Sequence, residues 1–263
     1  MRGVLIRIVS ALLLGIPVLL IVHVGSPAFE AMVAVSAAVL AWEWFGMCGN
    51  GRPDVVGILL GGVMLLGVGA AAVFGMGAAL AILAAGACAV WLASRGERWL
   101  TLGVLYLGLP CAAVVWLRNA PGVGHDLVFW LMAVVWAADI GAYASGRLIG
   151  GPKLAPRISP NKTWAGLIGG VGLAALISAA FAAFGGHGTA LLAPAALGLL
   201  LGLVSQAGDL GESWVKRRFG VKDASGLIPG HGGLLDRVDA LMAGIVLVAC
   251  MAAAGEGNVF RWL

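Results

Sequence analysis

Apolar runs of about 20 residues, separated by short polar stretches, repeat along almost the whole chain. A run of this length spans the hydrocarbon core of a bilayer as a helix. The mean hydropathy of +1.03 over 263 residues fits the same interpretation. The pattern predicts an all-α fold, a polytopic integral membrane helical bundle with about nine transmembrane helices. Their expected ranges are 4–24, 28–47, 55–74, 77–93, 99–117, 127–145, 164–184, 190–208 and 238–255.

The first apolar run could also be a signal peptide, because Arg2 and Arg7 accompany it. However, the run is long enough to span a membrane and lacks a clean small-x-small cleavage site. We therefore expect an uncleaved transmembrane helix.

Lysine and arginine are distributed unevenly between alternate loops of this topology. All but two of the 16 Lys and Arg residues fall on the side that holds the N-terminus, and the exceptions are Arg118 and Arg261. Cytoplasmic loops retain positive charge, so this distribution predicts a cytoplasmic N-terminus and an external C-terminus. It also accounts for the net charge of +4 without nucleic acid as a partner.

Only two predicted cytoplasmic loops have any length, at about 146–163 and 209–237. Neither can bury a core of its own. We therefore predict a single integral membrane domain over 1–263, in which N-terminal helices (1–120) precede catalytic helices and cytoplasmic loops (127–255). Chemistry would then be built from helix ends and these loops, at the cytoplasmic surface of the membrane.

Glycine is abundant, with 42 residues, and some glycines have the GxxxG spacing that lets membrane helices approach closely. The pairs are Gly57 with Gly61, Gly166 with Gly170, and Gly198 with Gly202. In so glycine-rich a chain, these pairs are weak evidence for any particular interface.

Three aspartates lie at the ends of the last two predicted helices. Asp209 follows the helix at 190–208, and Asp236 and Asp239 begin the next one, so Asp209 and Asp236 should lie at similar depth. Converging carboxylates repel unless a cation neutralises them, and hard oxygen ligands suit Mg²⁺ with substrate phosphates completing its shell. Alternatively, the helix dipole favours Asp236 and Asp239, and Asp209 pairs with a loop arginine.

Basic residues and glycines fill the loop between these aspartates. Lys216, Arg217, Arg218 and Lys222 precede the glycines of 226–233. Glycine-rich backbone can present N–H groups to a phosphate while Lys and Arg supply positive charge. Alternatively, these cations are an ordinary positive-inside cluster or an anchor on anionic headgroups.

A second polar group surrounds the other loop. Asp139, Tyr143 and Arg147 recur at helical spacing on one face, and a basic, proline-punctuated stretch follows at 151–163. Asp139 could contact a substrate or a second metal, or it could be neutralised by a loop lysine. Glu43 is less informative, because its neighbours Trp42 and Trp44 are typical of an interfacial belt.

The run SWVKRRFGVKDASGLIPGHGGLLDRVD at 213–239 resembles the defining motif of the phosphatidate cytidylyltransferases, also called CDP-diglyceride synthases. The resemblance extends to Gly208 with Asp209, to Asp139 with Tyr143 and Arg147, and to the Ser159-Pro160 and Lys162-Thr163 pairs. It covers the C-terminal half of the chain. The N-terminal helices agree only in hydropathy and in the Trp-Glu-Trp stretch.

This resemblance implies a reaction in which CTP and phosphatidic acid give CDP-diacylglycerol and pyrophosphate. It implies a Mg²⁺ requirement, with a metal pair held chiefly by Asp209 and Asp236, and a homodimer in a bacterial cytoplasmic (inner) membrane with its active site facing the cytoplasm. Implied catalytic residues are Asp209, Asp236, Asp239, Lys216, Asp223, Arg237 and His231. Implied substrate-binding residues are Ser213, Lys222, Ser159, Lys162, Arg147, Tyr143 and Asp139. For His231, a phosphate contact and a purely structural role in the turn stay equally open.

Two positions depart from the family pattern. Ile140 stands where the family usually has a hydroxyl residue, and Ala165 where it commonly has Glu. Two rival functions remain: a CTP-dependent enzyme acting on a polyprenol or ether lipid, and a secondary transporter. A transporter should show repeat symmetry and charges at the midplane, whereas the charges here gather at one face.

Overall fold

A computed structural model describes residues 13, 15–50, 54–185, 191–230, 232–255 and 260 of the chain. Within these residues, eight helices are long and apolar enough to cross a membrane. A shorter apolar helix, Gly15–Val24, precedes them, and the rest of the predicted first span lies mostly outside the described residues. The protein is therefore an all-α, multi-pass membrane protein, as predicted, while the orientation of its N-terminus stays a prediction.

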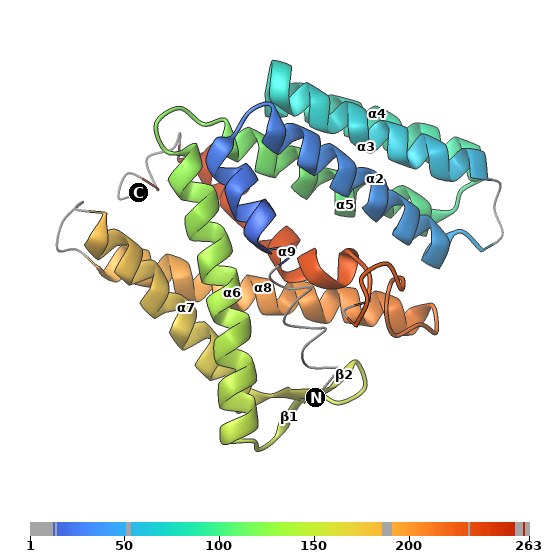
Figure 1. The fold of residues 1–263 in the computed structure, drawn as a ribbon. Coiled ribbons are helices and arrows are strands. Elements are labelled where there is room, and N and C mark those ends of the chain that lie inside the picture. Colours follow the sequence, from blue (N-terminus) through green and yellow to red (C-terminus); the bar gives the residue numbers. More distant parts are fainter. Residues whose placement is uncertain are drawn as a thin grey trace. The chain divides into compact units, whose positions relative to one another are not determined.

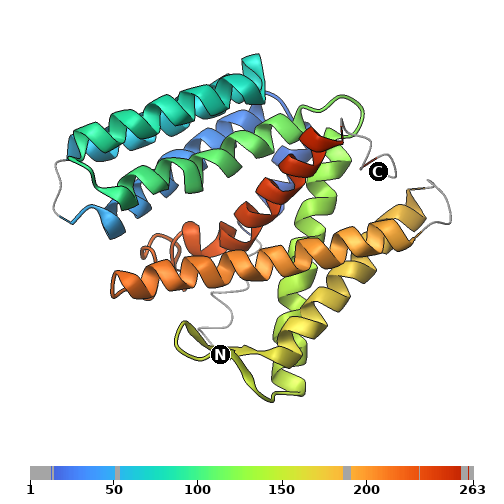
Figure 2. The ribbon, with the colours of Figure 1, turned by 180° about the vertical axis from the view of Figure 1, so that it is seen from behind.

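The chain divides into two compact units, and the first comprises 1–121 and 218–238. Four of its helices lie side by side (Figures 1 and 2): α2 (Ala28–Cys48), α3 (Asp54–Phe74), α4 (Met76–Ala93) and α5 (Arg98–Arg118). Trp44 of α2 is buried and donates its indole N–H to the carbonyl of Trp99 at 2.8 Å. Gly103 permits this approach, because a Cβ there would collide with the Trp44 ring. Phe219 packs edge-on against Trp99, which joins the later segment to α5.

The second unit comprises 122–217 and 239–263. Its elements are α6 (Gly124–Leu148), β1 (Lys153–Ala155), β2 (Ser159–Thr163), α7 (Trp164–Phe184), most of α8 (Leu192–Arg218) and most of α9 (Leu235–Ala254). The two strands form an antiparallel hairpin between the end of α6 and the start of α7 (Figure 1). Sequence patterning predicts only a loop there, because the short polar strands carry no alternating apolar signal.

Small residues bring the helices of the second unit together. A Cβ at Gly166 or Gly170 would meet the backbone of α6, and one at Gly198 or Gly202 would meet α7. These two GxxxG pairs therefore line helix contacts, whereas Gly61 has only an ordinary contact with Ala41. Close backbone approach is the usual reason for glycine in membrane helices.

A buried hydrogen-bond chain links three helices of the same unit. Trp130 of α6 donates its indole N–H to Ser178 Oγ of α7 at 2.9 Å. Ser178 in turn donates to the carbonyl of Pro194 in the first turn of α8 at 2.5 Å. Both side chains are almost fully buried, so the serine supplies a hydrogen-bond partner to two polar groups away from water.

Of two predicted helix boundaries near the motif, the first is wrong and the second is close to the observed one. Helix α8 ends at Arg218 rather than at 208, and α9 begins at Leu235 rather than at 238. Hydropathy detects where a helix leaves the apolar region, not where its backbone hydrogen bonds stop. Asp209, Ser213 and Lys216 therefore lie on a helix and have fixed places along its surface, and the intervening loop begins only after Arg218.

Candidate active site

A cavity of about 470 Å³ opens among α6, the hairpin, the start of α7 and α8. It contains five of the residues singled out from the sequence: Asp139, Tyr143, Arg147, Lys162 and Asp209. The lining also includes Gln206, Asn161 and the backbone of Gly146 and Gly166. Ser159, at the start of β2, is not part of this lining.

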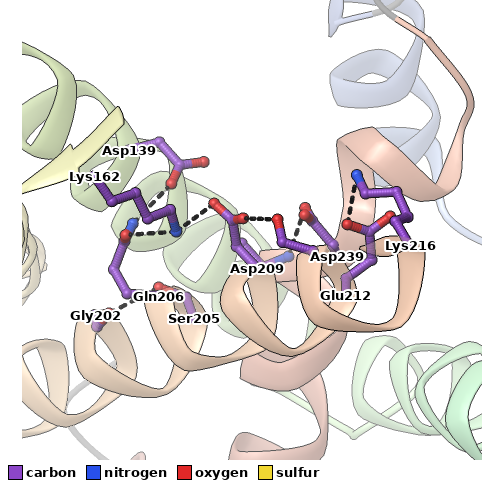
Figure 3. Close-up of polar contacts among 11 residues, drawn as sticks. Asp139, Lys162, Gly202, Ser205, Gln206, Asp209, Glu212, Lys216 and Asp239 are labelled. Carbon is purple, nitrogen blue, oxygen red and sulfur yellow. Dashed lines mark hydrogen bonds and ion pairs between the residues drawn. The ribbon is translucent and has the colours of Figure 1, made fainter. Parts of the chain in front are cut away.

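Lys162 connects the charged groups of this cavity. Its ammonium lies 2.6 Å from Asp209 Oδ2 and 3.1 Å from Gln206 Oε1. Gln206 then donates its amide N–H to Asp139 Oδ1 at 3.1 Å, so the side chains form one network across β2, α8 and α6 (Figure 3). The sequence had suggested, as one alternative, that Asp209 pairs with a loop arginine. The cation beside Asp209 is instead Lys162 of the hairpin.

Lys162 and Asp209 remain within reach of solvent. Their side chains are 18% and 28% exposed, respectively, and both border the cavity. Partial exposure means that water screens the pair and that a ligand could replace either partner. Gln206 is buried and therefore keeps the two ends of the network in place.

The end of α6 adds a second, more exposed cation. Arg147 donates to Tyr143 Oη at 2.8 Å, one helical turn away, as the i, i+4 spacing predicts. Close by, Thr163 caps the N-terminus of α7 by accepting from Gly166 N–H at 3.1 Å. A Cβ at Gly146 would lie only 3.1 Å from Thr163 Oγ1, so this glycine lets α6 meet the start of α7 beside the cavity.

Further along α8, acidic and basic side chains gather with the start of α9. Ser213 donates to Asp209 Oδ1 at 3.4 Å, and Lys216 Nζ lies 2.6 Å from Glu212 Oε2. Asp239 of α9 has three charged neighbours on α8, namely Asp209, Glu212 and Lys216. Figure 3 shows these four side chains close to one another.

Sequence reasoning did not single out Glu212. The structure shows that its side chain is buried, with 1% of its surface exposed. Its i, i+4 spacing to Lys216 is a signal that could have identified it. The structure also assigns Lys216, predicted to be catalytic, a definite partner within the protein.

In the first unit, the glycine-rich loop after α8 lines a cavity of about 620 Å³. Three predicted site residues, Lys222, Asp223 and Arg237, line it. Ile228 donates its N–H to the carbonyl of Gly232 at 2.8 Å, which closes a tight turn. Gly230 and Gly232 adopt φ values of 78° and 81°, a region that disfavours side chains. His231, between them, lies outside the described residues.

Asp236 folds this loop back onto the first turn of α9. Its Oδ2 accepts from the N–H groups of Ala224 at 2.9 Å and Gly233 at 2.7 Å. At these two positions, the glycine-rich backbone therefore binds a carboxylate of the protein itself. From the sequence, a phosphate was one possible ligand of such N–H groups.

Glu43 of α2 contacts the same loop, in a way that the sequence did not reveal. Its carboxylate, 1% exposed, accepts from Ser225 Oγ at 2.6 Å, Leu234 N–H at 2.8 Å and Leu235 N–H at 2.7 Å. Of the two flanking tryptophans, Trp42 is exposed, as an interfacial position requires, whereas Trp44 belongs to the core.

In the described part of the chain, no three His, Cys, Asp or Glu side chains form a group able to hold a metal ion. Carboxylate oxygens are present in each unit: Asp209 and Asp239 in the second, and Asp223 and Asp236 in the first. Mg²⁺ usually takes one or two carboxylates and completes its shell with water and phosphate oxygens. The donor chemistry of these residues therefore fits Mg²⁺ that arrives with a phosphorylated substrate.

Comparison with known proteins gives a consistent result. The sequence profile of the cytidylyltransferase family matches residues 5–254. A phosphatidate cytidylyltransferase of Brucella suis is 41% identical over 256 residues, which is 94% of this chain and 92% of the relative. A protein of the same name from Pseudomonas aeruginosa is 44% identical over 62% of this chain and 61% of its own length. One from Bacillus subtilis is 36% identical over 54% of this chain and 53% of its own length.

Proposed function

The chain belongs to the cytidylyltransferase family, and we propose that it transfers CMP from CTP to phosphatidic acid, giving CDP-diacylglycerol and pyrophosphate. The observation that carries this proposal is the near full-length similarity to phosphatidate cytidylyltransferases. Two cavities lined by Lys, Arg and Asp side chains, one in each unit, supply groups suited to phosphorylated ligands.

In this reaction, an oxygen of the phosphatidate phosphate attacks the α-phosphorus of CTP. A new P–O bond forms, the bond from that phosphorus to the bridging oxygen breaks, and pyrophosphate leaves with the electron pair. The attacking phosphate is already ionised near neutral pH, so no side chain must act as nucleophile or strong base. The protein contributes positioning and charge neutralisation, the usual basis of phosphoryl-transfer catalysis.

Lys162 and Arg147 would bind phosphate oxygens at the cavity of the second unit. Lys162 would exchange part of its contact with Asp209 for the ligand, while Gln206 keeps its ammonium oriented. Tyr143 would hold the Arg147 guanidinium in place, and Asp139 would hold Gln206.

Lys222 and Arg237 would bind phosphate oxygens in the first unit, where both line the loop cavity with Asp223. We assign Lys216 a different part from the one the motif implies. Its ammonium neutralises the buried Glu212, so Lys216 would set the charge around Asp239 and not bind substrate directly.

Asp209 and Asp236 are the metal ligands that the motif implies, and we propose them for Mg²⁺, with Asp239 and Asp223 in support. Bound Mg²⁺ would neutralise phosphate charge and align the reacting groups. The second contact of Asp209, from Ser213, would keep its carboxylate oriented. The two backbone contacts of Asp236 would do the same for that side chain.

We further propose that the protein is a homodimer in a bacterial cytoplasmic membrane, with its active site facing the cytoplasm. The bacterial sources of the relatives support the membrane assignment. The one-sided distribution of Lys and Arg supports the orientation.

A direct assay tests the reaction. Purified protein in mixed micelles receives radiolabelled CTP, Mg²⁺ and phosphatidic acid, and label is counted in the lipid extract. We expect label in CDP-diacylglycerol for the wild type and for the control Asp126→Asn, whose carboxylate is exposed at the start of α6. Asp236→Asn keeps an oxygen for the backbone contacts but removes the charge, and it should lose almost all activity.

Two outcomes would overturn the proposal. One is that no label enters lipid with the wild type, and the other is that Asp236→Asn equals the wild type. Polyprenol and an ether-linked lipid serve as alternative acceptors in parallel reactions. Preferential labelling of either would assign the enzyme to that lipid instead.

A further inference from the structure

Glu43 is a buried carboxylate that takes no part in the reaction as described above. It lies near the end of α2, with 1% of its surface exposed, among the apolar side chains of the first unit. A carboxylate in such a place is costly unless hydrogen bonds compensate for the lost water. What Glu43 binds therefore indicates why it is there.

Among the described residues, the donors to Glu43 come from the segment that leads into α9. Oε1 accepts from Ser225 Oγ and Leu234 N–H, and Oε2 accepts from Leu235 N–H. These residues lie 182 to 192 positions further along the chain. Both carboxylate oxygens are thus used to hold one distant segment.

The segment is shaped to receive this side chain. A Cβ at Gly233 would collide with Glu43 Oε1 and would lie 2.9 Å from Ser225 Oγ. Only glycine allows the backbone to come this close to the carboxylate. The contact therefore depends on residue types on both sides.

Glu43 also completes the start of α9. The first N–H groups of a helix have no partner within it, and a negative charge near them is favoured by the helix dipole. Leu234 and Leu235 supply two such N–H groups at the N-terminus of α9. One residue further on, Asp236 accepts from Ala224 and Gly233. Two carboxylates thus hold the same loop, one from α2 and one from α9.

We propose that Glu43 is a positioning residue, which fixes the loop 222–234 and the start of α9. In this way it sets the places of Asp236, Lys222 and Arg237. The kinetic part of this proposal rests on the proposed cytidylyltransferase function. The effect on the loop itself does not.

Glu43→Gln tests this proposal because it preserves volume while removing one acceptor. If the amide nitrogen replaces Oε1, it faces the Leu234 N–H, and if it replaces Oε2, it faces the Leu235 N–H. Either orientation loses a backbone hydrogen bond. Glu30→Gln is the matched control, since it lies on the same helix and contacts Asn119, not the loop.

The first measurement is amide hydrogen exchange of the full-length protein in micelles. We expect Leu234 and Leu235 to exchange about tenfold faster in Glu43→Gln, with the core of α3 unchanged. Ser225→Ala removes a single donor and should speed exchange in the same direction by a smaller factor. It also keeps the proposal testable if Glu43→Gln does not fold.

The second measurement separates positioning from a general loss of folded enzyme. We expect the KM of the substrate whose phosphate is held by Lys222 and Arg237 to rise about tenfold in Glu43→Gln, while the KM of the other substrate changes less than about twofold. A lower fraction of folded protein reduces kcat and leaves both KM values as they are. The Glu30→Gln control should match the wild type in both.

Unchanged exchange at Leu234 and Leu235 would overturn the proposal, and so would unchanged KM values for both substrates in an active enzyme. If the wild type shows no cytidylyl transfer, the proposed function fails by itself. Hydrogen exchange then decides separately whether Glu43 fixes the loop.

Discussion

Lys162→Met removes the cation at the centre of the network in the second unit and keeps an unbranched side chain of nearly the same length. Asp209 then loses an ion pair at 2.6 Å, and Gln206 loses a donor at 3.1 Å. We expect a small loss of stability and a large loss of activity. The expected loss of stability and the expected loss of activity have different physical causes.

The expected loss of unfolding free energy is small because water screens the ion pair between Lys162 and Asp209. At 2.6 Å and an effective dielectric constant of about 20, the direct attraction is about 6 kcal/mol, but desolvation and side-chain ordering oppose most of it. Exposed pairs contribute a net of roughly 0.2–1 kcal/mol. With side chains 18% and 28% exposed, we expect a loss of about 1 kcal/mol.

The expected loss of catalytic activity is larger because a contact to a substrate phosphate acts where charge develops during the reaction. Loss of one such contact costs about 3–4 kcal/mol, or roughly a hundredfold to a thousandfold in kcat/KM. The assay is initial-rate cytidylyl transfer at varied CTP, with unfolding in detergent followed in parallel. Lys153→Met is the control, since it removes the same charge from an exposed position on β1 of the same hairpin.

We expect the control to stay within about twofold of the wild type. If Lys162→Met retains activity within a few-fold of the wild type, its role at the phosphates is refuted. An equal loss in Lys153→Met would show that the hairpin needs positive charge in general and not a cation at one place.

Ser178→Ala should lower the free energy of unfolding by about 1–3 kcal/mol, measured by denaturant titration in micelles, because it removes the acceptor of the Trp130 indole N–H and the donor to the Pro194 carbonyl; unchanged stability would contradict this. Lys216→Met should destabilise by about 3–5 kcal/mol, since it removes the ion-pair partner of the buried Glu212 carboxylate, and adding Glu212→Gln should restore most of the loss. No recovery in the double variant would show that the charge of Glu212 is not the cause. Chelation with EDTA should abolish transfer and added Mg²⁺ should restore it, while activity that survives chelation would exclude the metal requirement.

Hydropathy predicts the transmembrane helices well because burial in lipid depends on a local property of each segment. The ranges expected for α3 and α7 differ from the observed Asp54–Phe74 and Trp164–Phe184 by at most one residue at either end. The same signal fails at the end of α8, where the helix continues past Asp209 as a polar helix. Its backbone hydrogen bonds persist where its apolar side chains stop.

The candidate site is predicted in part. Asp139, Tyr143 and Arg147 follow from helical spacing, and the structure places all three at one cavity with Lys162 and Asp209. Residues whose role depends on a distant partner escape prediction. Gln206, Glu212 and Glu43 look unremarkable in sequence, yet each is buried and holds a charged or polar group.

The sequence by itself therefore determines the membrane topology class, the family and most of the polar residues at the site. These properties depend on the hydropathy of single segments and on a contiguous motif. Only the tertiary structure decides which group each charge contacts: Lys162 with Asp209, Lys216 with Glu212, and the start of α9 with Glu43. Hydrogen bonds and ion pairs need atoms about 3 Å apart, and folding alone brings residues far apart in the chain to that distance.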